Sequence, residues 1–241
     1  MNTNKAALAE YIINEDELME DAIDFSNENG DFNKLNNYYD NISSGKCNGC
    51  GKCCYESVQT NFIEFLNIIN FLKNDPSLLE DILNQVEHYY MHDLFQNNTC
   101  PMLDNNNRCK IYSVRPLVCR LFGHYSQEDH EKNYLETLEN NKVIKDYYID
   151  NYDLDIPDER LLKKVEHCSD YENNMKVSTE LMTQIKDDIL MIDSKYFAEG
   201  FIDENAYNMG LVEWFIYLFF DESLAEKRIN FSKLKLSENL K

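Results

Sequence analysis

CNGCGKCC, at residues 47–54, holds four of the eight cysteines in this chain of 241 residues. Cys47, Cys50 and Cys53 are each separated by two residues, which is how ferredoxin-type loops present three thiolates to one iron–sulfur cubane. Gly49 and Gly51 stand between them, and glycine permits the tight turns, some with positive φ, by which a chain wraps a metal. The stretch predicts a cysteine-rich metal loop, and we expect the fold to be built around it.

The other cysteines are scattered singly along the chain. A zinc site would more often show two separated Cys-x2-Cys pairs, so one dense triple with single cysteines elsewhere favours an iron–sulfur centre and leaves zinc as the alternative. Cys53 and Cys54 are neighbours whose side chains are expected to diverge, so one of them is predicted to serve a second metal position, a substrate or the core. The predicted metal ligands are Cys47, Cys50, Cys53, Cys54, Cys100, Cys109, Cys119 and Cys168, with Cys119 and Cys168 also readable as core cysteines.

The charge of the chain restricts its partners and its compartment. Its 44 acidic and 23 basic residues give a formal charge of -21, which repels phosphate backbones, so neither nucleic acid nor an anionic membrane is an expected partner. Residues 1–16 lack a secretory pattern, and the longest apolar run, at 211–220, is too short for a bilayer. We therefore expect a cytoplasmic protein, whose reduced cysteines are metal ligands or reactive thiols rather than disulfides.

The two central cysteine segments, 45–54 and 100–124, have the opposite charge. They contain six basic residues and one acid, for a net charge of +5. Positive charge near thiols lowers their pKa and offsets the charge of a thiolate-ligated centre. Arg115 and Arg120 are the candidate cofactor-binding residues in this region, because arginine also binds anionic groups of a substrate.

Hydrophobic periodicity predicts a mainly α protein, an irregular helical domain with a cysteine-rich metal loop and one small β-hairpin. We expect one domain over 1–241, made of a cysteine-cluster core at 45–124 and a helical extension at 125–241. In the hairpin, Leu103 is expected opposite Arg108 and Met102 opposite Cys109. The predicted helices cover 7–25, a short stretch before 41, 60–72, 76–90, 116–123, 127–148, 161–171, 178–199 and 203–220.

Histidines carry less weight than cysteines. His88 and His92 stand one helical turn apart and could chelate a metal, but no further ligand is paired with them in the sequence, so surface histidines are the simpler interpretation. His124 follows the predicted helix of Cys119 and is the best candidate for an added ligand or an acid–base group.

The linked motifs resemble a known family. CNGCGKCC at 47–54, Cys100-Pro, Cys109-Lys-Ile-Tyr, and RPLVCRLF at 115–122 are similar to the YkgJ-like cysteine-cluster family, a zinc- or iron-chelating domain, over about residues 45–124. The resemblance implies that the cysteines are metal ligands. One branch of that family is the flagellin lysine N-methylase, so the resemblance also raises methyl transfer from S-adenosylmethionine to protein lysines.

Three functions follow as hypotheses. The first is a metal-binding protein with a 4Fe-4S centre and a redox or maturation role, which would have a redox partner. The second is a lysine N-methylase-like enzyme with a protein substrate and S-adenosylmethionine as cosubstrate. The third is a structural zinc module, in which the metal replaces missing core. No phosphate-binding loop or dinucleotide-binding motif is present to favour another class of enzyme.

Overall fold

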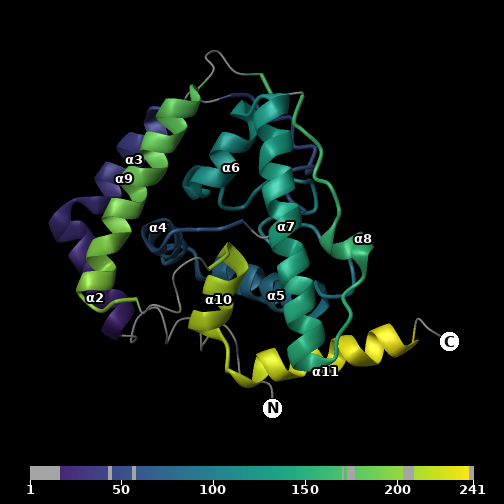
Figure 1. Ribbon diagram of the computed structural model, residues 1–241. Coiled ribbons are helices and arrows are strands. Elements are labelled where there is room, and N and C mark those ends of the chain that lie inside the picture. The colour runs from purple at the N-terminus through teal and green to yellow at the C-terminus, as the bar shows by residue number, and fades with distance from the viewer. Residues whose placement is uncertain are drawn as a thin grey trace.

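A computed structural model describes residues 17–42, 45–55, 58–169, 171–172, 177–202 and 209–238. It is mainly helical, as predicted, and Figure 1 shows helices crossing at varied angles rather than a regular bundle. In the part described, β-structure is limited to three isolated bridges. The helices are α2 Glu17–Asn29, α3 Asp31–Asp40, α4 Phe62–Leu72, α5 Pro76–His92, η1 Tyr112–Val114, α6 Leu117–Leu121, η2 Phe122–His124, α7 Gln127–Tyr152, α8 Asp158–Leu161, α9 Thr179–Ala198, α10 Leu211–Phe219 and α11 Ser223–Glu238.

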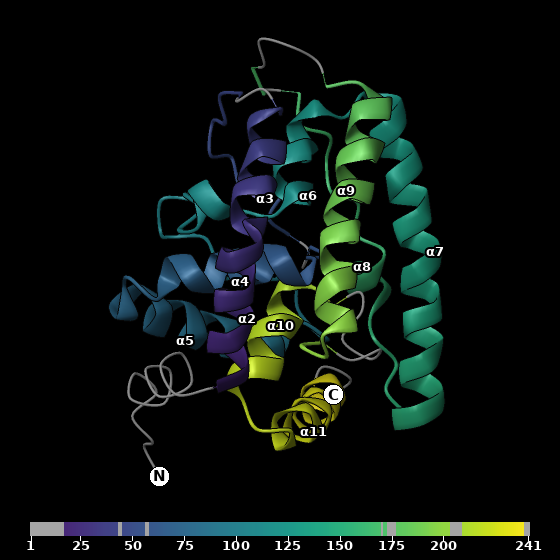
Figure 2. The ribbon, with the colours of Figure 1, turned by 90° about the vertical axis from the view of Figure 1, so that its left-hand side faces the viewer.

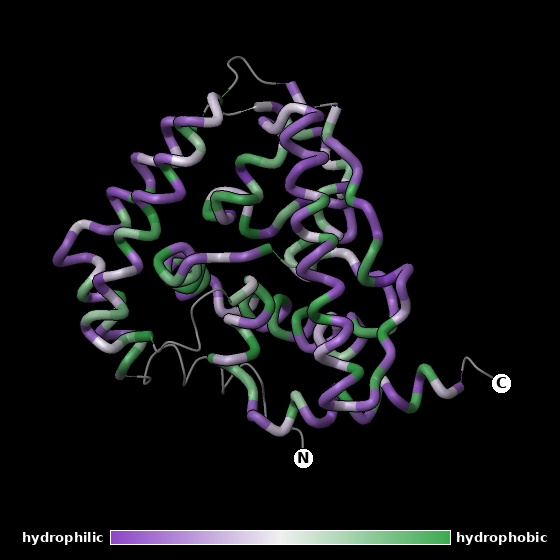
Figure 3. Tube along the Cα trace, viewed as in Figure 1, coloured by the Kyte–Doolittle hydropathy of each residue, from purple (hydrophilic) through white to green (hydrophobic). Residues whose placement is uncertain are grey.

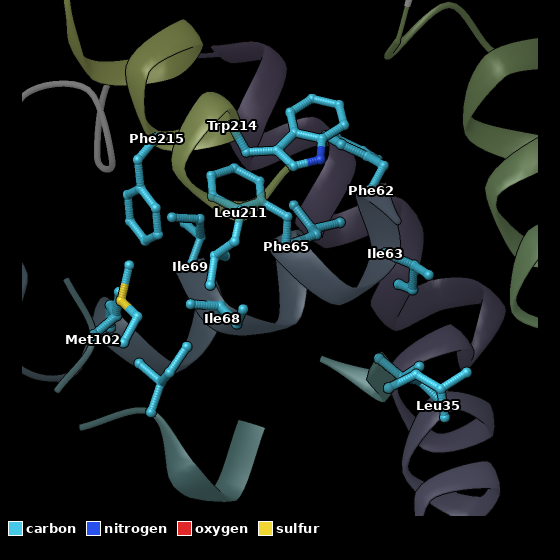
Figure 4. Packing of buried hydrophobic residues seen from close by; sticks show 14 of the residues in the cluster. Leu35, Phe62, Ile63, Phe65, Ile68, Ile69, Met102, Leu211, Trp214 and Phe215 are labelled. Carbon is cyan, nitrogen blue, oxygen red and sulfur yellow. The ribbon is translucent and has the colours of Figure 1, made fainter. Parts of the chain in front are cut away.

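Helix α4 is the centre of the core. Its sequence, FIEFLNIINFL, is apolar on almost every face, so it must be buried all round, and nine of its eleven residues are. Phe65 stacks on Trp214 of α10 with ring centroids 5.5 Å apart and meets Phe215 edge-on at 5.2 Å (Figure 4). Trp214 also donates its indole N–H to the carbonyl of Thr60, at 2.8 Å. These contacts fix α10 against the start of α4.

Helices α2, α3 and α9 form one wall of the molecule against α4 (Figures 1 and 2). Helices α10 and α11 both pack on α5. The short helix α6 lies between α9 and the long helix α7 in Figure 1, and the cysteine segments adjoin it. The wall and the α4 layer therefore support the region of the chain on which the predicted ligands lie.

Capping residues explain where several helices begin. Asp75 accepts a hydrogen bond from the Leu78 N–H at 3.0 Å and Pro76 follows at the first helical position, as the sequence predicts for α5. Ser178 caps α9 by accepting from the Leu181 N–H at 3.2 Å, again as expected. At α4 the cap is Asn61 rather than Thr60, with Glu64 completing a capping box.

Two local predictions are wrong. The loop of the turn at 100–110 is one residue longer than the predicted four, because Leu103 pairs with Cys109 in an isolated bridge and Lys110 N–H bonds the carbonyl of Met102 at 2.8 Å. The pairing is thus shifted by one residue from the predicted register. The helix predicted at 161–171 does not form in the described residues either: α8 ends at Leu161, and 163–168 have no regular secondary structure.

The two ends of the described chain also differ from the prediction. Helix α2 begins at Glu17, and the earlier part of the helix predicted at 7–25 lies outside the described residues. The last predicted helix is observed as α10 from Leu211, with 203–208 outside the description, and a further helix, α11, follows it. The sequence of α11 has no clear apolar stripe, which is why periodicity did not indicate it.

Helix α7 is largely hydrophilic along its length (Figure 3). Only His130, in its first turns, is buried. None of the helices in the described ranges combines the length and the apolar character needed to cross a bilayer.

Candidate metal centre

One cavity of about 130 Å³ is lined by all eight cysteines. They come from four separate parts of the chain: the loop at 47–54, the turn at 100–109, helix α6, and the segment after α8. For comparison, a cavity needs only about 10–15 Å³ on this measure to hold one water molecule. The structure therefore brings the predicted ligands together around a space larger than one small ion.

The loop at 47–54 owes its shape to its two glycines. Gly49 and Gly51 have φ values of 66° and 69°, in the region that glycine adopts without strain. A Cβ atom at Gly49 would also lie 3.1 Å from the Arg108 guanidinium, so a side chain there would crowd this arginine. The Gly49 N–H donates to the Cys47 sulfur at 3.4 Å. The glycines thus let the loop turn its cysteines inward, as the sequence predicts.

The neighbouring cysteines of this loop do not diverge as expected. The Sγ atoms of Cys53 and Cys54 lie 3.7 Å apart, and both residues line the cavity. Cys54 N–H bonds the carbonyl of Gly51 at 3.0 Å, and this turn brings the two side chains to the same side. The prediction that one of the pair points elsewhere is therefore wrong in this structure.

The turn at 100–109 is joined to the loop by its backbone. Cys100 donates its N–H to the carbonyl of Cys54 at 2.6 Å. Met102 and Ile111, on either side of the turn, are buried at 1% exposure and anchor it to the core. Cys100 and Cys109 are consequently held at the edge of the core, facing the loop.

A buried glutamate sets the position of helix α6. Glu64 of α4 accepts the Leu117 N–H at 2.6 Å and the Tyr39 hydroxyl at 2.7 Å. The first of these bonds satisfies an N–H in the first turn of α6, which has no partner within the helix itself. Glu64 thereby ties α6, and with it Cys119, to the central helix of the core.

Residues 162–169 and 171–172, which we call the return segment, bring the chain back to the cysteine loop. They include Cys168 and Tyr171, and the Tyr171 hydroxyl accepts the Gly45 N–H at 2.8 Å. Lys46 N–H then bonds the carbonyl of Glu172 at 2.7 Å. The side chains of Lys52 and Glu166 make an exposed ion pair at 2.7 Å between the same two segments.

Tyr171 fits between two glycines that are far apart in sequence. A Cβ atom at Gly45 would lie 2.2 Å from its ring, and one at Gly123 would lie 2.3 Å from it. Both are closer than real Cβ atoms come to other atoms, so either substitution would displace the ring. The aromatic side chain thus holds the return segment, including Cys168, against the cysteine loop and the end of α6.

Burial keeps several thiols protonated in the absence of metal. It raises the pKa of Cys100 to about 12 and also raises the pKa of Cys109 and of Cys119. The contact between Cys53 and Cys54 lowers the pKa of Cys53 and raises that of Cys54, because one thiol can donate to the thiolate of the other. A metal that binds here must therefore displace protons from the buried cysteines.

The two candidate arginines face different surroundings. Arg115 lines the cavity, and its positive charge acts to lower the pKa values of Cys53, Cys109 and Cys119. Arg120 is not among the lining residues: its guanidinium lies 3.9 Å from the centroid of the Tyr39 ring and donates to the carbonyl of Arg115 at 2.9 Å. The structure brings Arg115 to the cysteines and directs Arg120 toward the wall at α3.

None of the histidines considered from the sequence lines the cavity. His88 and His92 stack on α5 with ring centroids 4.2 Å apart, and His92 Nδ1 lies 2.7 Å from the carbonyl of His88. His124 is buried beside Tyr171, with ring centroids 5.2 Å apart. His124 therefore lies beside the return segment and is not part of the cavity lining.

The donor set suits a thiophilic metal centre. Eight cysteine sulfur atoms line one cavity, and thiolate sulfur is the donor that zinc and iron–sulfur centres prefer. Within the described residues, no three Cys, His, Asp or Glu side chains are already placed to hold a single ion. The cysteines thus surround a space without converging on one point.

Sequence reasoning missed Tyr171 and Glu64. Each acts through residues distant in the chain, Tyr171 through Gly45 and Gly123 and Glu64 through Leu117 and Tyr39. The glutamate at the third position of a capping box is a recognisable local signal, but the bonds that position α6 are not.

Comparison with known proteins gives one match. Residues 46–143 match the model of the CxxCxxCC family, which is described as a "Putative zinc- or iron-chelating domain". No curated protein and no solved structure matches the chain. The match starts at the cysteine loop and continues beyond the cysteine-rich turn into α7. The family resemblance is therefore confirmed: over residues 46–143 the chain matches a family described as chelating zinc or iron, which supports metal binding in general.

Proposed function

We propose that this protein holds a cysteine-ligated iron–sulfur centre of the 4Fe-4S type and serves in electron transfer or in maturation of another protein. The observation that carries the proposal is the single cavity lined by all eight cysteines. A reducing, cytoplasmic setting belongs to the proposal, because the ligands must be free thiols, as they are in the structure.

The size of the cavity and the arrangement of the thiols support a cluster over one zinc ion. Four thiolates about 2.3 Å from a zinc ion would lie roughly 3.8 Å from one another. Cys53 and Cys54 meet that spacing, but no third described ligand joins them at one point. A cluster needs thiolates spread around a larger body, which is the arrangement that a cavity of about 130 Å³ offers.

The cysteines differ in how they would serve such a centre. Cys50 is the exposed one and the other seven are partly buried. We propose Cys47, Cys53, Cys54, Cys100, Cys109 and Cys119 as the set from which the four ligands come, because these thiols line the cavity and interact electrostatically with one another. Cys50 and Cys168 would remain for a second centre or for ligand exchange.

Anaerobic purification with metal and sulfide analysis tests the proposal. We expect about four iron atoms and about four acid-labile sulfides per chain, with broad visible charge-transfer absorption. One zinc ion per chain without sulfide would instead support the structural zinc module, which the family description also allows. Protein without any thiolate-bound metal would contradict both.

The lysine-modifying function stays a prediction from the family resemblance. Binding of S-adenosylmethionine to the full-length protein, measured by calorimetry, would be the first result in its favour. No binding at millimolar concentrations would count against it.

A further inference from the structure

Arg115 is a partly buried cation in the wall of the cysteine cavity. It lies between η1 and α6, and its guanidinium carbon sits 3.8 Å from the centroid of the Tyr112 ring. Its Nε atom is buried, and no acceptor within the described part of the chain hydrogen-bonds to it. A buried hydrogen-bond donor without an acceptor destabilises the folded protein, so this unpaired Nε–H requires a structural or functional explanation.

Four other basic residues near the cysteines are paired with an acid, bonded away from the cavity, or exposed to water. Lys110 pairs with Asp81 at 2.6 Å and Lys52 with Glu166 at 2.7 Å. Arg120 donates to two backbone carbonyls away from the cavity. Arg108 lines the cavity too, but it is exposed, so water screens its charge. Arg115 is thus the partly buried cation that faces the thiols.

We propose that Arg115 is a positioning residue of the metal centre, whose charge and Nε–H compensate the negative charge that the thiolates acquire when metal binds. This inference rests on the proposed function and concerns the same site. Tyr112 would hold the guanidinium in place by stacking beneath it.

The expected direction of the change in metal affinity follows from the charge of the metal-bound site. Four thiols that lose their protons and take up a divalent ion form a site with a net charge of about −2. A fixed positive charge nearby stabilises that product more than the protonated, metal-free site. At a distance of about 10 Å and an effective dielectric constant of about 20, one unit of charge changes an equilibrium by more than tenfold. Removing the charge should therefore weaken metal binding.

Cobalt titration of the full-length, metal-free protein tests the inference directly. Co²⁺ bound to thiolates gives charge-transfer absorption, so its Kd can be measured under anaerobic conditions whichever metal the protein carries naturally. The variants are Arg115→Met, which removes the charge, Arg115→Lys, which keeps it, and Arg108→Met as the matched control on the exposed side of the cavity. Circular dichroism of each variant checks that the helices are retained.

We expect Arg115→Met to raise the Kd for Co²⁺ at least tenfold, Arg115→Lys to restore most of the affinity, and Arg108→Met to change the Kd less than threefold. If the natural centre is iron–sulfur, Arg115→Met should also lower its reduction potential, where a tenfold change in the one-electron equilibrium equals 59 mV. Equal Kd values for Arg115→Met and Arg108→Met would overturn the inference, as would a lysine variant as weak as the methionine variant. Failure of the wild-type protein to bind Co²⁺ through thiolates would instead overturn the proposed function itself.

Discussion

At the scale of single residues, the clearest buried charge outside the cysteine site is Asp193 of α9. Its two carboxylate oxygens accept the N–H groups of Phe62 and Ile63, at 2.7 and 2.9 Å, at the start of α4. Burial nevertheless raises the pKa of Asp193 to about 7, against the effect of these bonds. This carboxyl group links the wall formed by α2, α3 and α9 to the central helix.

Asp193 should make the stability of the protein depend on pH. Its pKa is higher in the folded chain than the ordinary 3.8, so the folded state binds the proton more tightly, and stability is lost as pH rises from about 4 to about 7. The loss should be on the order of 3 kcal/mol. Urea unfolding at pH 5 and at pH 8 measures it. Asp193→Asn should remove this part of the slope, and parallel pH profiles for the two proteins would refute the assignment.

At the scale of elements, the return segment joins the later half of the chain to the cysteine loop. Its hold depends on the Tyr171 ring lying against Gly45 and Gly123. The helix predicted for this segment would have kept Cys168 on a helix surface. In the observed non-helical conformation, Cys168 lines the cavity and Tyr171 meets both glycines.

Gly123→Ala should therefore displace the return segment. We expect a destabilisation of about 1–3 kcal/mol from the forced shift of the Tyr171 ring, together with weaker metal retention. The double variant Gly123→Ala/Tyr171→Ala provides the control, because the added methyl group then has no ring to meet. If the two single effects simply add in the double variant, Tyr171 is not the cause.

Helix α11 is tied to α5 by a buried ion pair. Arg228 donates from Nη2 to both carboxylate oxygens of Asp93, at 2.6 and 2.8 Å, and its guanidinium lies 4.1 Å from the centroid of the Tyr90 ring. The desolvated pair is a specific connection between a helix that periodicity missed and the core.

Replacing one member of this ion pair should lower the free energy of unfolding more than replacing both members. Arg228→Met leaves the Asp93 carboxylate buried without its partner, so we expect a loss of about 3–5 kcal/mol in the free energy of unfolding. The double variant Asp93→Leu/Arg228→Met should recover most of the loss, because no charge remains buried. Chemical denaturation of the four proteins completes the cycle, and a double variant as unstable as Arg228→Met would argue against this account.

At the scale of the whole molecule, the cavity is lined by residues that lie far apart in the sequence. Residues 45–124 supply most of its wall, but Cys168, Tyr171 and Leu211 come from the extension that follows. The lining of the cavity is therefore complete only when the segments after residue 124 are folded onto the cysteine segments.

Removing the metal should destabilise the molecule as a unit. Binding to the folded state alone stabilises it by about 2.7 kcal/mol when free metal is at one hundred times its Kd. We expect chelation to lower the Tm in one cooperative transition, since the cavity draws on both parts of the chain. Calorimetry before and after chelation measures the shift. An unchanged Tm, or separate transitions for the two parts, would contradict this description.

The amino-acid sequence by itself determined the helical class, the starts of α5 and α9, and the cysteine motif of the metal domain. These features are local: caps and periodicity act within a few residues, and the glycines of the loop at 47–54 set its own turns. The family match rests on the same local spacing of cysteines.

Only the tertiary structure decided which residues complete the site. Arg115 and Arg120 are similar in sequence context, yet only Arg115 reaches the cavity, because Arg120 is drawn to Tyr39 on α3. Likewise, Cys168 reaches the other cysteines because Tyr171 packs on two distant glycines. Such contacts depend on the packing of elements far apart in the chain, which no local pattern of residues records.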